Sequence, residues 1–233
     1  MSVDAVVMAA GEGRRLRPLT ERYPKPVLPL DGEPVVVHVL RDLAAADIAR
    51  VWVVTGHLGA QVEALVGDGS GFGLAVTFTR QPGVLGSADA VHRGLAAGAE
   101  PPFLVAAADT VFEPGDVSRF AAAAEHAAGG LAVRRVPAPD PPHRWGTRVE
   151  NGRVVAVLDR ERTSDVSGAP LWSIGAELVP YLEGLSGPPY ELADAYERAV
   201  AADIVVVGFE IGRTRDLTHP ADLVRENFPY LGS

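Results

Sequence analysis

Residues 3–26 of the chain read VDAVVMAAGEGRRLRPLTERYPKP, an apolar run that leads into a glycine-containing turn and then into a group of cations. The run Val3–Ala9 has the length and composition of a buried strand, and the turn at Gly11–Gly13 follows it directly. Such a turn exposes backbone N–H groups and lets a phosphate approach the backbone closely. Four cations follow within twelve residues, namely Arg14, Arg15, Arg17 and Lys25. This stretch predicts a strand that ends in a phosphate-binding loop.

Strands and helices alternate through the rest of the first half. Apolar runs predict strands at 51–55, 74–79 and 103–107, and amphipathic stretches predict helices at 34–46, 60–66, 87–97 and 116–127. Repeated alternation of this kind favours a largely parallel, doubly wound sheet, in which ligands lie beyond the carboxyl ends of the strands. Gly11 and Asp109 both fall at such ends.

The second half departs from this regular pattern. A Pro-rich segment at 137–143 comes first, and an Asn151-Gly152 turn then joins two predicted strands. Further elements are predicted at 170–174, 192–202, 204–209 and 220–227. No shift in composition marks a linker, so we expect a single domain over 1–233, with 136–233 as a smaller lobe built onto the sheet of 1–135.

Composition excludes several classes of function. The chain is 47% hydrophobic, which is enough for a substantial core, and its formal net charge is −9. That acidity gives no long-range attraction to nucleic acid or to anionic membranes, so we expect neither as a partner. Without cysteine there are no disulfides, thiolate nucleophiles or iron–sulfur clusters. The apolar start lacks a basic leader and no later run approaches about 20 apolar residues, so we expect a cytoplasmic protein.

The phosphate-binding loop matches neither of two common motifs. A dinucleotide fingerprint requires a third glycine where Leu16 stands, and the Gly-Lys-Ser/Thr of a Walker loop is absent. The lysine content is unusual as well, because Lys25 is the only lysine among 21 basic residues. An ammonium is a compact charge that can sit against a phosphate where a planar guanidinium does not fit.

The segment Ala9–Pro26 closely resembles the signature of sugar-1-phosphate nucleotidyltransferases, with its glycine loop, Arg, Leu, Pro-Leu-Thr and Pro-Lys-Pro. Gln81-Pro82 and the segment 85–90 resemble the part of that family that contacts the nucleobase, and Asp109 matches its metal-binding aspartate. The resemblance implies a Rossmann-like α/β fold with a mostly parallel mixed sheet flanked by helices. It makes 1–135 a nucleotide-binding half and 136–233 a sugar-binding lobe with a C-terminal metal-site segment.

The resemblance also implies a reaction, in which an NTP and a sugar 1-phosphate give an NDP-sugar and pyrophosphate with Mg²⁺ as cofactor. Arg15 would brace the β- and γ-phosphates, Lys25 would sit at the α-phosphate and the sugar phosphate, and Asp109 would hold Mg²⁺. The nucleotide-binding residues implied are Ala10, Gly11, Gly13, Arg14, Gln81, Gly86 and Ser87. Both substrates are small molecules. The Pro-rich segment and the last helix are the predicted surfaces for a homo-oligomeric contact.

The sugar half departs from the family pattern. Glu210 stands where the family has its second metal-binding aspartate, and we expect it to bind Mg²⁺ with Asp109. The Glu-Lys-Pro element that grips the sugar phosphate has its counterpart in Asp159 and Arg160. Gly168-Ala169-Pro170 replaces an Asn-Ala-Gly element, which removes an amide from the sugar pocket.

These departures leave alternatives open. Segment 85–90 most resembles uridylyltransferases, so UTP is favoured over dTTP. An acceptor that is a cyclitol phosphate or another non-sugar phosphate would explain the altered sugar half. A catalytically weak nucleotide-binding regulator would explain Glu210 and the lost amide, but it has less need of the metal ligand at Asp109.

Overall fold

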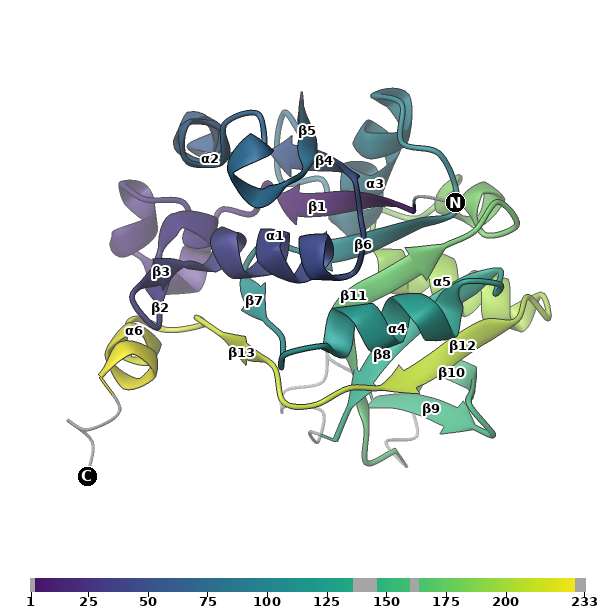
Figure 1. The fold of residues 1–233 in the computed structure, drawn as a ribbon. Helices are drawn as coiled ribbons and strands as arrows, with labels where there is room; N and C mark the ends of the chain where they lie inside the picture. The colour runs from purple at the N-terminus through teal and green to yellow at the C-terminus, as the bar shows by residue number, and fades with distance from the viewer. Residues whose placement is uncertain (1–2, 136–145, 160–163, 229–233) are drawn as a thin grey trace.

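The computed structural model describes residues 3–135, 146–159 and 164–228. Its centre is a nine-stranded mixed sheet with the strand order β5-β4-β1-β6-β11-β8-β12-β10-β9 (Figure 1). The strands are β1 (Asp4–Ala9), β4 (Arg50–Thr55), β5 (Ala75–Arg80), β6 (Phe103–Ala107), β8 (Gly129–Arg134), β9 (Gly146–Glu150), β10 (Arg153–Asp159), β11 (Ser167–Ile174) and β12 (Val206–Glu210). Strands β5, β4, β1 and β6 run parallel, and β11 is antiparallel to both of its neighbours β6 and β8. The predicted fold class is confirmed.

Helices cover both faces of this sheet. They are α1 (Val35–Ala45), α2 (Gly59–Val66), α3 (Ser87–Ala96), α4 (Asp116–Ala124), α5 (Leu192–Ala201) and α6 (Pro220–Asn227). Short 3-10 turns are η1 (Arg14–Leu16), η2 (Leu19–Glu21), η3 (Lys25–Val27), η4 (Ser70–Phe72) and η5 (Val179–Leu182). Helices α1, α2 and α4 contribute to one hydrophobic core, and α3 and α5 contribute to the other.

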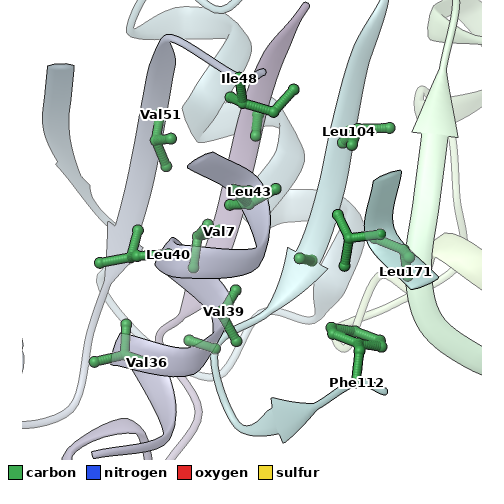
Figure 2. Packing of buried hydrophobic residues seen from close by; sticks show 14 of the residues in the cluster. Val7, Val36, Val39, Leu40, Leu43, Ile48, Val51, Leu104, Phe112 and Leu171 are labelled. Atoms are coloured by element: carbon green, nitrogen blue, oxygen red, sulfur yellow. The ribbon is translucent and has the colours of Figure 1, made fainter. Parts of the chain in front are cut away.

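The alternation of side chains along β1 explains why its sequence is apolar after the first residue, Asp4. Val7 belongs to the core on the α1 side and Val6 belongs to the core on the α3 side. Successive side chains of a strand point to opposite faces, so a strand covered on both faces is apolar at nearly every position. Figure 2 shows Leu40 and Leu43 of α1 over Val7 and its neighbouring strands.

The structure contains short elements that the pattern did not predict. Strand β8 begins with Gly129-Gly130, and glycine is unfavourable in a strand. Gly130 is needed because a Cβ there would lie 2.9 Å from the Cβ of Ala124 in α4, and a Cβ on Gly129 would lie 2.5 Å from the Leu178 side chain. Two ribbons of two-residue strands were also not predicted: β2 (Pro29–Leu30) with β3 (Glu33–Pro34), and β7 (Thr110–Val111) with β13 (Arg215–Asp216).

Two segments are expected to form a homo-oligomeric contact, the Pro-rich segment and the last helix. Segment 137–143 is outside the described residues. Helix α6 docks within the chain, because the Asn227 amide donates to the Pro29 carbonyl at 2.8 Å and accepts from the Gly32 N–H at 3.0 Å. Over the described ranges, none of the helices is long and apolar enough to span a membrane.

Candidate active site

The glycine loop follows β1 and is shaped by the conformation of Gly13. Gly13 has φ +61°, a left-handed conformation that favours glycine, and a Cβ there would lie 2.9 Å from the Thr20 methyl group. The Thr20 hydroxyl donates to the Gly13 carbonyl at 3.0 Å and holds the loop. At Gly11, by contrast, no heavy atom of a described residue lies within 4 Å of such a Cβ. The loop is therefore fixed at Gly13 and open above Gly11.

Lys25 and Asp109 meet beside this loop. The Lys25 Nζ donates to the Asp109 Oδ2 at 2.6 Å, with the lysine side chain 12% exposed and the aspartate 35% exposed. Turn η3 places the lysine, and Asp109 follows the carboxyl end of β6. The arrangement leaves an ammonium and a carboxylate at the edge of the sheet where a doubly wound fold binds its ligands.

Two cavities share this edge. The loop cavity, of about 280 Å³, is lined by Gly11, Gly13, Arg14, Arg15, Lys25, Asp109 and their neighbours. The large cavity, of about 570 Å³, extends from Arg15, Lys25 and Asp109 toward β8, β10 and β11. The three predicted catalytic residues line both cavities and mark the junction between them.

The arginines of the loop differ in their contacts. Arg14 donates to Glu12 at 2.7 Å, and this hydrogen bond lowers the pKa of the Glu12 carboxyl. Arg15 makes no hydrogen bond or ion pair with any residue that the structure describes, although it lines both cavities. Its guanidinium is therefore available to a ligand at the junction.

A second carboxylate lines the large cavity together with Asp109, and it is not Glu210. In the β7–β13 ribbon Asp216 stands opposite Thr110, the residue after Asp109, and both aspartates line the large cavity. Sequence reasoning missed Asp216. The available signal was a further carboxylate six positions after Glu210 in the same C-terminal segment.

Glu210 has a different environment. It ends β12, is 48% exposed, and accepts two hydrogen bonds from the guanidinium of Arg135 at 2.8 and 3.0 Å. Arg135 also pairs with Asp165. Glu210 does not line either of the cavities that contain Asp109.

The pair Asp109 and Asp216 suits a hard cation. Magnesium is usually held by one or two carboxylates together with substrate phosphates and water, so a complete set of protein ligands is not required. Among the residues described, no group of three or more His, Cys, Asp or Glu side chains is placed to hold a metal. The donor set therefore fits Mg²⁺ brought together with a phosphorylated substrate.

Gln81 lies in a separate side cavity of about 280 Å³, lined by Ala10, Gly56, His57, Gln81, Pro82 and neighbouring residues. Its side chain is nearly buried, and its Nε2 donates to the Gly86 carbonyl and to the Asp89 Oδ2, both at 2.9 Å. Two acceptors on one side fix the amide orientation, so the Oε1 is left for another donor.

Gly86 and Ser87 support this region, Gly86 by close backbone packing and Ser87 by hydrogen bonds of its hydroxyl. A Cβ on Gly86 would lie 2.2 Å from the Tyr190 carbonyl oxygen. The Ser87 hydroxyl donates to Glu191 and accepts from the Leu192 N–H at 2.8 Å. These bonds join the start of α3 to the start of α5. Neither residue lines any of the three cavities, so their predicted nucleotide contact stays a prediction.

The far wall of the large cavity is built from the second half of the chain. Gly168-Ala169-Pro170 lies on this wall, together with Trp172 of β11 and with Val157 and Leu158 of β10. Asp159 is not on it: the carboxyl is buried and accepts the Ser164 N–H at 3.0 Å, so it holds the chain that follows β10. Arg160 lies outside the described residues. Wall residues that sequence reasoning did not identify are Arg134, Thr147, Arg213 and Thr214.

Comparison with known proteins gives a consistent result. The family model described as nucleotidyl transferase matches residues 4–157. The chain is 46% identical over 85 residues to mannose-1-phosphate guanylyltransferase of Mycobacterium tuberculosis, covering 36% of this chain and 24% of that protein. It is 32% identical over 143 residues to N-acetylmuramate alpha-1-phosphate uridylyltransferase of Neisseria meningitidis serogroup B, covering 60% of each. The chain thus spans between a quarter and three fifths of these relatives' lengths.

Among solved structures, the inositol-1-phosphate CTP transferase from T. maritima has the same fold. It superposes with a TM-score of 0.81 at 21% identity, covering 95% of this chain and 91% of that chain.

Proposed function

The chain belongs to the nucleotidyl transferase family, and on that basis we propose that it transfers a nucleotidyl group from an NTP to a sugar 1-phosphate, giving an NDP-sugar and pyrophosphate. One observation carries this proposal: Arg15, Lys25 and Asp109 line both the loop cavity and the large cavity. A triphosphate over the glycine loop and a phosphorylated acceptor in the large cavity would meet at these three side chains.

The reaction is an in-line displacement at phosphorus. An oxygen of the acceptor phosphate attacks the α-phosphorus, the bond from that phosphorus to the oxygen bridging to the β-phosphate breaks, and pyrophosphate leaves. Such a transfer depends on positioning and on charge neutralisation more than on covalent chemistry by the protein. Lys25 would orient and neutralise the acceptor phosphate and the α-phosphate, and Arg15 would stabilise the charge that develops on the leaving pyrophosphate.

We assign the metal to Asp109 and Asp216 in place of Asp109 and Glu210. Support comes from the β7–β13 register and from the shared wall of the large cavity. Bound Mg²⁺ would supply Lewis-acid neutralisation of phosphate charge. The two carboxylates would hold it, while the cations on the same wall orient the phosphates.

The base is proposed as uracil first and thymine second. Support comes from segment 85–90 and from the uridylyltransferase among the relatives, while the guanylyltransferase among them shows that the base varies within the family. The Gln81 Oε1 is able to accept a hydrogen bond, and the N3–H of uracil or thymine is a suitable donor.

The wall of the large cavity that is built from the second half of the chain supports a second candidate acceptor. The Gly168-Ala169-Pro170 wall lacks the amide that a sugar pocket of this family has, which favours a cyclitol phosphate or another non-sugar acceptor. A regulator with weak catalysis is less well supported, because Lys25, Asp109 and Asp216 all line one cavity.

The test is release of pyrophosphate with Mg²⁺ over a matrix of the common NTPs and a panel of sugar and cyclitol 1-phosphates. We expect release that requires one particular pair. No pyrophosphate release from any pair, together with measurable NTP binding, would favour the regulator. No release and no NTP binding would contradict the assignment of the glycine loop.

A further inference from the structure

Two arginines line the large cavity in addition to the cations beside the glycine loop. Arg134 is the last residue of β8, and Arg213 lies in the segment that leads into β13. The described residues that line the large cavity thus include four cations, Arg15, Lys25, Arg134 and Arg213, and two carboxylates, Asp109 and Asp216. In a chain of net charge −9, such a grouping of cations around one cavity points to an anionic ligand.

The other polar groups on this wall also favour a ligand rich in acceptors. The Thr214 side chain is buried, with the residue 8% exposed, and its Oγ1 has no hydrogen-bond partner among the described residues. The Trp172 indole N–H makes no hydrogen bond to a described residue. Within the described part of the wall there is no amide side chain, and the only carboxylates are Asp109 and Asp216. A buried hydroxyl left unpaired is costly, so a ligand group that pairs with Thr214 would bind favourably.

The strand order sets the distance between Arg134, at the end of β8, and Asp109, which follows β6. Strands β6 and β8 lie on either side of β11 and are both antiparallel to it, so their carboxyl ends share one edge of the sheet. Arg134 ends β8 opposite Ser167, and Asp109 follows β6. Two strand spacings separate β6 from β8, which is about 10 Å. A ligand whose phosphate meets Lys25 would therefore present the far side of its organic part to Arg134.

We propose that the acceptor carries a second anionic group on its organic part, a carboxylate or a second phosphate, which binds Arg134 together with Arg213 and Thr214. This inference rests on the proposed function and narrows its acceptor class. Arginine donates two parallel hydrogen bonds to an oxyanion. A neutral sugar offers hydroxyls that donate as well as accept, whereas an oxyanion only accepts and so matches the two guanidinium groups, which only donate.

Three ligands with one common ring test the proposal: glucose 1-phosphate, glucuronic acid 1-phosphate and glucose 1,6-bisphosphate. The second adds a carboxylate at C6 and the third adds a phosphate there. Titration calorimetry of the full chain with Mg²⁺ should give a Kd at least about tenfold lower for one or both of the anionic ligands. Which of the two binds more tightly identifies the source of the anionic group.

Single variants test whether Arg134 and Arg213 cause the preference for the anionic ligands. Arg134→Gln and Arg213→Gln should each reduce the preference to about threefold or less, because each should weaken binding of the anionic ligands more than binding of glucose 1-phosphate. The matched control is Arg135→Gln, because Arg135 follows Arg134 directly but pairs with Glu210 and Asp165 and does not line the cavity. This control should keep the full preference.

Equal binding of the three ligands, including binding too weak to measure for all of them, would overturn the inference, as would a preference that survives in both variants. The proposed function fails by a different readout. Preferential binding of the anionic ligands without pyrophosphate release from any NTP would contradict the transfer reaction and leave the acceptor chemistry standing.

Discussion

The Lys25 ammonium and the Asp109 carboxylate lie 2.6 Å apart, although 84 positions separate them in the sequence. The contact joins the turn after the glycine loop to the end of β6, at the point where the loop cavity meets the large cavity. A single ion pair thereby fixes where a nucleotide and an acceptor would come together.

Removing either partner should affect turnover strongly. We expect Lys25→Ala and Asp109→Asn each to lower kcat by roughly two orders of magnitude or more, the effect of losing one preorganised electrostatic group. Lys25→Arg should not restore activity, because a planar guanidinium does not fit the position of an ammonium. Pyrophosphate release measures the effect and thermal unfolding controls for folding. A near wild-type rate in either of the first two variants would refute this assignment of the active site.

Variants of Asp216 and Glu210 should differ clearly in the Mg²⁺ concentration that they need for activity. Asp216→Asn should raise the Mg²⁺ concentration needed for half-maximal activity by about tenfold or more, because it removes one of two carboxylate ligands. Glu210→Gln should leave that concentration within about twofold, because Glu210 pairs with Arg135 away from the cavity. A magnesium titration of both variants makes the comparison, and the reverse order of effects would return the ligand to Glu210.

The glycine loop offers a matched pair of alanine variants. Gly13→Ala should destabilise the fold by about 1–3 kcal/mol, because alanine is strained at φ +61° and its methyl group would meet Thr20. Gly11→Ala meets no described atom within 4 Å, so its stability should stay close to wild type while its KM for NTP rises. Urea unfolding and NTP kinetics on both variants test this, and an unchanged KM for Gly11→Ala would argue against phosphate binding over the loop.

Asp42 predicts a dependence of stability on pH. Burial raises the pKa of Asp42 to about 6, with Asp116 raising it further and His38 opposing the shift. The folded state then binds this proton more tightly than the unfolded state, where the value is 3.8, so Asp42 makes the fold less stable as the pH rises from about 4 to above 6. Asp42→Asn should stabilise the protein at pH 8 by roughly 1 kcal/mol, since part of the carboxyl stays in solvent.

Thermal unfolding of wild type and Asp42→Asn between pH 4 and 8 measures that difference. The gain should shrink steadily as the pH falls toward 4, because the folded carboxyl becomes protonated below about pH 6 and the unfolded one, with a pKa of 3.8, begins to take up the proton near pH 4. A gain that is constant over the whole range would show that Asp42 acts through packing and not through its charge.

Periodicity was sufficient to predict most of the fold. Strand Phe103–Ala107 and helix Pro220–Asn227 have the predicted bounds, and α1 differs from its prediction by one residue at each end. These elements bury continuous apolar faces, which leave a clear pattern in the sequence. Strand β8 was missed because its first two residues are glycines, which have low strand propensity. A Cβ on Gly130 would meet Ala124 of α4, and a Cβ on Gly129 would meet Leu178.

The same reason explains which site residues could be predicted. Arg15, Lys25 and Asp109 lie in or beside motifs, and the structure brings them to one junction. Arg134 and Asp216 lie in elements that have little pattern of their own, the glycine-led β8 and the two-residue strand β13. Their positions depend on register with distant strands, which a local reading of the sequence does not contain.

Strand β11 has a consequence for attempts to exchange parts between relatives. It hydrogen-bonds to β6 on one side and to β8 on the other, and residues 168–170 of the same strand form part of the wall of the large cavity. A chimera that takes its acceptor-binding half from another family member must therefore import a strand whose backbone matches both ladders. Recombination near residue 135 would place a foreign β11 against the native β6, so new acceptor specificity should arise more readily from point changes on β8, β11 and the segment before β13 than from swapping whole halves.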